Sequence, residues 1–86
     1  MFYVYVIESQ KTLDLYKGFT VDVNKRLKEH NKGVTKSTKN GIPWKLIYCE
    51  VFKNKQDAIE REKYLKSGWG RKYLEKVLKN YFKRKK

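Results

Sequence analysis

Two short apolar runs separated by a polar stretch open the chain and predict a β-hairpin. Residues Phe2–Ile7 (FYVYVI) are dense in β-branched and aromatic side chains, which is typical of a strand covered on both faces. Residues 8–14 are polar apart from Leu13 and are expected to form the connecting loop. Residues Leu15–Thr20 (LYKGFT) form a second strand, which so short a connection makes antiparallel to the first.

A helix, an exposed loop and a third strand are predicted next. The helix begins where Thr20 or Asp22 can cap its free amide groups, and it ends before Gly33. Residues 32–43 are rich in Gly, Ser, Thr, Asn and Lys, so we expect an exposed loop. Residues Trp44–Phe52 (WKLIYCEVF) have the composition of a strand.

Two further helices complete the pattern. Asn54 caps the first, which runs to about Lys66 and is ended by Gly68. The second runs from about Arg71 to Phe82 with one apolar stripe. The order β-β-α-β-α-α predicts an α+β fold in which helices flank a small three-stranded, mainly antiparallel sheet. The length of 86 residues suits a single domain, residues 1–86, with a short basic C-terminal tail.

The charge of the chain indicates the kind of partner. There are 22 Lys and Arg against 9 Asp and Glu, a formal net charge of +13. Such an excess indicates a polyanion, nucleic acid first and an acidic membrane surface second. Lys36 and Lys39 in the loop, with the basic C-terminus, are expected to contact phosphates whatever the base sequence. No apolar run is long enough to span a bilayer, and a basic amphipathic anchor on a membrane is the minority interpretation, so nucleic acid rather than a membrane is the expected partner.

The single cysteine, Cys49, excludes an internal disulfide. It stands in an apolar run, so we expect it in the core. One cysteine fits a reducing compartment. The N-terminus has no basic segment before its apolar residues and does not look like a secretion signal, so a cytoplasmic location is expected.

Tyr5 and Tyr16 are the first candidates for chemistry. In the predicted hairpin they can pair side by side on one face of the sheet. Gly18, two positions beyond Tyr16, would leave a hole beside it for a backbone or a substrate. Both tyrosines also fit a simpler interpretation, as core aromatics whose hydroxyl groups find partners at the edge. The residues alone leave the two interpretations of Tyr16 open.

Arg26 and His30 are four residues apart, so they project from one face of the predicted helix. A guanidinium there can bind two phosphate oxygens and offset the negative charge that develops on phosphorus. The imidazole can accept or pass a proton near neutral pH. A solvated helix face is the commoner explanation for such a pair taken alone.

Glu62 is a further candidate, and it supports a functional interpretation of Arg26 and His30. On the next predicted helix it lies among the apolar positions Ala58, Ile59 and Leu65, whereas Glu60 points away. A carboxylate on the buried side is costly unless it pairs with an arginine or binds a cation. One carboxylate is a weak Mg²⁺ site by itself. Mg²⁺ nevertheless keeps most of its waters and completes its shell with substrate phosphate.

Together these residues resemble the signatures of the GIY-YIG endonuclease superfamily. The chain looks like its small single-domain bacterial members, which are similar to the N-terminal nuclease domain of the ABC excinuclease. The resemblance covers nearly the whole chain, from Phe2 to about Leu74. The set is specific, although each motif alone is weak. The matching segments are Tyr3-Val4-Tyr5, Tyr16-Lys17-Gly18, the T-x-D-x-x-x-R-L-x-x-H-N pattern of residues 20–31, the Pro43-Trp44 pair and the A-I-x-R-E-K-x-L-K run of residues 58–66.

The resemblance implies metal-dependent hydrolysis of phosphodiester bonds in DNA, in repair or processing, with one Mg²⁺ or Mn²⁺ ion. It makes Tyr5 and Tyr16 the signature tyrosines, one of them a general base helped by the nearby histidine, His30. Arg26 would stabilise the phosphate and Glu62 would bind the metal. A free tyrosine titrates at about 10, so Arg26 and the metal would have to lower that pKa. Which tyrosine is the base is left open.

The chain also departs from the family signatures. Tyr3 and Val4 replace the Gly and Ile of the first, and Lys17 replaces the Ile of the second. Lys17 faces away from Tyr16, so the site is not expected to suffer. The family's late asparagine has no clear counterpart, and no added DNA-targeting domain is expected, which leaves weak or lost activity open. The alternative function is a non-catalytic nucleic-acid-binding module that keeps the fold and basic surface. Repair-complex proteins are possible further partners.

Overall fold

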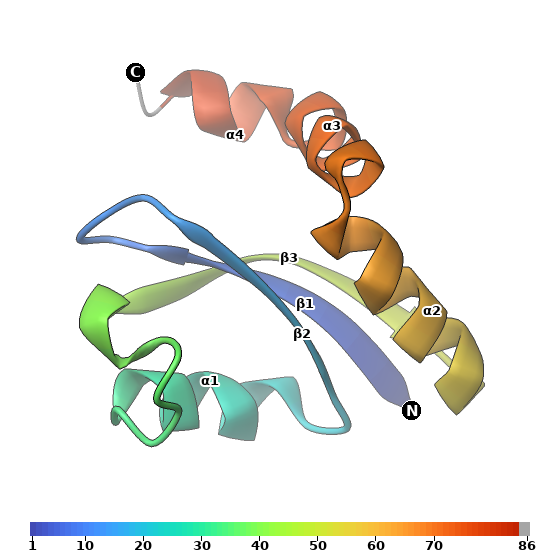
Figure 1. Cartoon of the computed structure of the whole chain (residues 1–86), viewed down its shortest axis with the longest axis horizontal. Coiled ribbons are helices and arrows are strands. Elements are labelled where there is room, and N and C mark those ends of the chain that lie inside the picture. Colours follow the sequence, from blue (N-terminus) through green and yellow to red (C-terminus); the bar gives the residue numbers. More distant parts are fainter. Residues whose placement is uncertain (85–86) are drawn as a thin grey trace.

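The computed structural model describes residues 1–84 and shows a three-stranded sheet with helices on both faces (Figure 1). The strands are β1 (Phe2–Ser9), β2 (Leu15–Thr20) and β3 (Trp44–Phe52). Their order is β2-β1-β3, and β1 pairs antiparallel with both neighbours. The predicted α+β class and three-stranded antiparallel sheet are confirmed. The last two residues of the predicted basic tail lie outside the described part of the chain.

The first two helices begin at the residues that the sequence indicated. Asp22, rather than Thr20, caps α1 (Val23–Asn31), and its carboxylate accepts a hydrogen bond from the Lys25 N–H at 3.0 Å. Asn54 caps α2 (Lys55–Lys66) by accepting from two amides of the first turn. Each cap satisfies amides that would otherwise lack partners. None of the helices within residues 1–84 has the length and apolar character needed to cross a membrane.

The third predicted helix is in fact two helices, and it starts earlier than expected. They are α3 (Gly68–Val77) and α4 (Lys79–Arg84). Gly68 does not end α2; Ser67 does, and its hydroxyl also caps α3 by accepting from the Gly70 N–H. A Cβ on Gly70 would lie 2.3 Å from the Leu65 Cα. Because glycine lacks that atom, α3 can begin directly against the end of α2.

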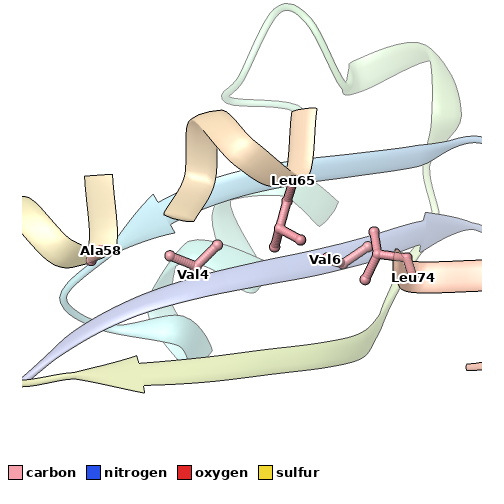
Figure 2. Packing of buried hydrophobic residues seen from close by; sticks show 5 residues of the cluster. All are labelled: Val4, Val6, Ala58, Leu65 and Leu74. Carbon is pink, nitrogen blue, oxygen red and sulfur yellow. The ribbon is translucent and has the colours of Figure 1, made fainter. Parts of the chain in front are cut away.

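Each face of the sheet has its own apolar cluster, because successive residues of β1 point to opposite faces. The cluster under α2 and α3 is shown in Figure 2 and consists of Val4, Val6, Ala58, Leu65 and Leu74. The cluster under α1 consists of Tyr5, Ile7 and Trp44, with Tyr16, Val23, Leu27, Ile42 and Leu46 packed against it. Burying each large apolar side chain contributes about 1.5–3 kcal/mol, so both faces stabilise the sheet.

The segment 32–43, expected to be an exposed loop, is anchored at several points. It contains a short 3₁₀ helix, η1 (Lys39–Gly41), and its Thr38 is only 1% exposed. The Trp44 indole N–H donates to the Thr38 carbonyl oxygen at 2.7 Å. The Asn31 side chain donates to the Trp44 carbonyl and accepts from its amide, at 3.0 and 2.6 Å. The loop is therefore held against both α1 and β3.

Cys49 is exposed, so its predicted place in the core is wrong. It lies on β3, an edge strand, directly opposite Tyr5 of β1. Helix α1 is joined to β3 through Asn31 and Trp44, at the other end of that strand. An apolar run in the sequence shows that a segment is a strand, but it does not show which of its residues a helix will cover.

Candidate active site

The β1–β2 register places the two signature tyrosines diagonally. Tyr5 pairs with Gly18, and Ile7 pairs with Tyr16, so the tyrosine rings are neighbours with centroids 6.4 Å apart. A Cβ on Gly18 would lie 2.4 Å from the Tyr5 hydroxyl oxygen. The hole expected beside Tyr16 is therefore filled by the ring of Tyr5. Gly18 lets this phenol cross β2 in close contact with its backbone.

His30 joins the phenol to the loop. It is fully buried in the last turn of α1, so the solvated helix face considered for it is wrong. Its Nε2 lies 2.8 Å from the Tyr5 hydroxyl oxygen, and its Nδ1 lies 2.7 Å from the Thr38 hydroxyl oxygen. The Thr38 hydroxyl donates to the Thr35 carbonyl at 3.4 Å. We therefore assign the ring proton to Nδ1, which leaves Nε2 to accept from Tyr5.

Arg26 and Tyr16 complete the group around the phenol. Arg26 Nη1 lies 3.0 Å from Glu29 Oε1, and the Arg26 side chain is 27% exposed. Its guanidinium is close enough to Tyr5 to affect the titration of the phenol. The Tyr16 ring meets the His30 ring edge-on at 5.0 Å. Within residues 1–84 the half-buried Tyr16 hydroxyl makes no hydrogen bond, so it is available to a ligand.

Burial controls the titration of both central groups. It raises the pKa of Tyr5 to about 12, and Arg26 offsets only part of that rise. Burial also lowers the pKa of His30, and the positive charge of Arg26 lowers it further. Arg26 by itself therefore does not bring the pKa of the phenol below its ordinary value. At neutral pH the pair consists of a neutral phenol and a neutral imidazole.

Glu62 approaches the phenol from α2. Its charge is among those that raise the pKa of Tyr5, so the carboxylate lies within electrostatic range of that hydroxyl. Its side chain is 21% exposed, and its Oε2 lies 2.9 Å from the Nζ of Lys66, one turn along the helix. The arginine partner considered for Glu62 is thus replaced by a lysine. The neighbouring Arg61 pairs with Glu50 instead.

The donor set around Glu62 is sparse. Within residues 1–84, no three His, Cys, Asp or Glu side chains are grouped closely enough to hold a metal ion together. Glu62 supplies oxygen donors, which suit hard cations such as Mg²⁺. Such an ion can keep most of its waters and take further oxygens from a phosphate. The residues present therefore fit a cation held by one carboxylate and completed by substrate, but not a preformed metal centre.

Thr38 is the site residue that sequence reasoning missed. It lies in a polar loop where no periodic pattern marks a buried position. Lys36 and Lys39, predicted to contact nucleic acid, flank it and are both exposed. The only indication in the sequence was indirect, since a histidine in the last turn of a helix lies next to the loop that follows.

A second polar cluster lies under α2, on the other face of the sheet. Arg61 donates to both carboxylate oxygens of Glu50, from Nε at 2.8 Å and from Nη2 at 3.0 Å. Its guanidinium also lies over the rings of Tyr64 and Tyr73, 4.9 and 4.6 Å from their centroids. Burial alone would raise the pKa of Glu50, but the hydrogen bonds from Arg61 and Tyr48 hold it below its ordinary value.

Comparison with known proteins identifies the family. The model of the GIY-YIG catalytic domain family matches residues 1–86. A UPF0213 protein of Clostridium perfringens is 45% identical over 67 residues, which cover 77% of this chain and 71% of that protein. One from Streptococcus agalactiae is 43% identical over 65 residues, covering 74% and 73%. The solution NMR structure of a UPF0213 protein from Bacillus halodurans has a TM-score of 0.55 and 31% identity, covering 90% of this chain and 85% of the other. This chain therefore belongs to the GIY-YIG family, as its signature residues predicted.

Proposed function

We propose that this protein is an endonuclease that hydrolyses phosphodiester bonds in DNA, in repair or processing, with the help of one divalent cation. Its family implies a nuclease-type domain and a nucleic acid substrate. The observation that carries the proposal is the convergence of four elements on one phenol. β1 supplies Tyr5 itself, α1 supplies Arg26 and His30, the loop supplies Thr38, and α2 brings Glu62 within electrostatic range.

The titration of the central pair supports a proton relay rather than a phenolate base. A phenol with a pKa of about 12 is protonated at neutral pH, so it cannot take a proton from water without first losing its own. The neutral His30 can accept that proton at Nε2, 2.8 Å away. In the proposed step a water oxygen bonds to phosphorus and the bridging phosphorus–oxygen bond opposite it breaks. The water proton passes to Tyr5 as Tyr5 passes its own to His30, and the leaving oxygen takes a proton from solvent.

The other residues have electrostatic and positioning roles in this proposal. Arg26 offsets the negative charge that accumulates on the phosphate oxygens in the transition state. The Thr38 hydroxyl oxygen accepts a hydrogen bond from Nδ1–H of His30 and so keeps Nε2 free for Tyr5. Tyr16, whose hydroxyl is available, orients the phosphate or the attacking water. Glu62 would hold the cation, which when bound supplies positive charge to the phosphate and the attacking water.

A second candidate is a nucleic-acid-binding module without catalysis. Two observations favour it. Lys66 already neutralises Glu62, and the described residues contain no ready metal cluster. In this alternative Arg26 is an ordinary phosphate contact, and the basic surface binds nucleic acid in a salt-sensitive way.

Cleavage assays with a matched pair of variants separate the two candidates. Purified wild type, Glu62→Gln and Glu60→Gln are incubated with nicked and branched DNA, with Mg²⁺, Mn²⁺ or a chelator. Glu60 is the control because it lies on the same helix, is exposed, and its carboxylate accepts a hydrogen bond only from Gln56 among residues 1–84. The proposal predicts cation-dependent cleavage that Glu62→Gln lowers by about 10²-fold or more and Glu60→Gln leaves unchanged. Equal cutting by all three proteins would remove the catalytic role of Glu62, and binding without any cutting would favour the module.

A further inference from the structure

A cleft next to the candidate active site shares Tyr16 and Thr38 with it, but the rest of its lining has no role in the reaction described above. Its volume is about 1150 Å³, and it opens between the β1–β2 hairpin, the loop around residues 37–41 and helices α3 and α4. Figure 1 shows α4 running across the hairpin end of the sheet. Tyr16 lines the cleft as well as the active site, so a ligand in one would be continuous with a ligand in the other.

The walls of this cleft carry four basic side chains, Lys17, Arg71, Lys79 and Lys83. Acidic residues are present too, but two of them are engaged. The Glu8 carboxylate accepts from the Tyr81 hydroxyl at 2.6 Å, and the Asp14 carboxylate accepts from the Thr12 hydroxyl at 3.0 Å. Glu75 also lines the cleft. Among the described residues, no carboxylate forms an ion pair with Lys17 or Arg71.

Lys17 and Arg71 come from different elements, yet both line the cleft and they lie within electrostatic range of each other. Lys17 is half-buried on β2, and Arg71 is in the first turn of α3. Burial lowers the pKa of Lys17, and the positive charge of Arg71 lowers it further. Two like charges that line one cleft within electrostatic range repel each other, and an anion bound between them would remove that repulsion. A phosphate group has the required charge and accepts hydrogen bonds from both cations.

The rest of the cleft suits the bases of a single strand. Its volume exceeds the usual range of small-molecule pockets, about 300–1,000 Å³, so it can hold a stretch of unpaired nucleotides. Phe82 and Tyr16 add aromatic surface to its lining, on which bases can stack. A duplex keeps its bases paired and stacked inside, so it cannot insert them into a cleft. The shape therefore favours an unpaired strand over a continuous double helix.

We propose that this cleft binds the unpaired stretch of a DNA strand that flanks the scissile phosphate, with one backbone phosphate between Lys17 and Arg71. The inference rests on the proposed nuclease function for the position of the scissile phosphate. It adds a substrate class, DNA with a single-stranded segment next to the cleavage point. It also gives a role to Lys17, the residue at which the second signature of this chain departs from the family.

The test is a binding measurement without cations, so that cleavage plays no part. Fluorescence anisotropy compares a labelled oligothymidylate of about twelve nucleotides with a blunt hairpin duplex, across a salt series. The full-length proteins are wild type, Lys17→Met, Lys17→Arg, Arg71→Ala and Lys53→Ala. Lys17→Met keeps the apolar stem that packs on the sheet, and Lys17→Arg keeps the charge. Lys53 is the control because it is an exposed lysine that does not line the cleft.

Lys17→Met and Arg71→Ala should each weaken binding of the single strand about five- to tenfold and reduce the salt slope by about 0.7. Lys17→Arg and Lys53→Ala should change the affinity for the single strand by about twofold at most. The affinity for the duplex should also change by no more than about twofold in any variant. The inference is overturned if Lys17→Met and Arg71→Ala lose no more than Lys53→Ala, or if they lose as much on the duplex. If the single strand binds as expected but no substrate is cut, the cleft stands as a single-strand site and the nuclease proposal fails.

Discussion

The two polar clusters of this protein lie on opposite faces of one sheet and differ in how fully their charges are neutralised. Under α2, Glu50 receives two hydrogen bonds from Arg61, and the guanidinium lies over two tyrosine rings. Under α1, the centre is a neutral Tyr5–His30 pair, while the charged Arg26 makes a single hydrogen bond to a carboxylate, that of Glu29.

This difference separates a structural cluster from a candidate reactive one. A carboxylate with a bidentate arginine partner has little capacity left for a ligand. The buried Tyr5 phenol and His30 imidazole form a hydrogen-bonded chain along which a proton can move, and the positive charge of Arg26 lies near it. We therefore expect substitutions under α2 to change stability and substitutions under α1 to change chemistry. Four substitutions and their controls test this contrast, beginning with the largest effect.

The largest expected effect is on cleavage by Arg26→Ala. In the proposed mechanism Arg26 acts mainly on charge that develops in the transition state, so the single-turnover rate should fall by about 10²–10³-fold. DNA affinity should fall by less than about tenfold. Lys28→Ala, which removes an exposed charge from the same helix, is the control. Parallel losses of rate and affinity would make Arg26 a simple phosphate contact.

The next effect is on stability, from Glu50→Gln. Removing the charge leaves the partly buried Arg61 without its carboxylate, so the free energy of unfolding should fall by about 2 kcal/mol. Urea denaturation measures it. Glu62→Gln is the matched comparison, because the Glu62–Lys66 pair is more exposed and should contribute about 0–1 kcal/mol. If the two variants lose the same stability, the proposed contrast between the clusters is wrong.

Thr38→Val should have smaller effects, on both the stability of the protein and the pH profile of cleavage. It leaves the His30 Nδ1–H without its acceptor in a buried site, which costs about 1–3 kcal/mol. Without that acceptor the imidazole is less well positioned to receive the Tyr5 proton, so the pH profile of cleavage should shift. Thr38→Ser keeps the hydroxyl and should restore both the stability and the profile. A change in stability with an unchanged pH profile would confine Thr38 to a packing role.

The smallest effect is the dependence of stability on pH. Stability should fall in two separate pH ranges as the solution is made more acidic. The pKa of folded His30 is lowered, so below its ordinary value of 6.5 the unfolded chain takes up a proton that the folded chain refuses. Stability then falls as the pH falls. Glu50 gives a second decline below 4.5, because its pKa is also lowered by folding. Urea titrations of His30→Gln at several pH values should lack the decline assigned to His30 and keep the one assigned to Glu50. If both declines persist, or both disappear, the assignment is wrong.

Part of this architecture was readable from local sequence patterns. The three strands follow the apolar runs, and Asp22 and Asn54 mark the starts of two helices because a cap depends only on the next two or three amides. The signature residues gave the family, and the helical spacing of Arg26 and His30 placed them on the α1 side of the sheet. These features depend on residues close together in the chain or on a recognisable set of motifs.

The tertiary structure decided the rest, because each remaining feature depends on which distant segments come into contact. The meeting of Gly70 with the end of α2 sets the early start of α3, and the packing of α1 leaves Cys49 exposed. Thr38 becomes a partner of His30 only because the loop is held against β3 by Asn31. Burial, which no local pattern measures, raises the pKa of Tyr5 and lowers that of His30. The sequence by itself named the residues of the candidate site other than Thr38, and only the packing around them determined their protonation states and partners.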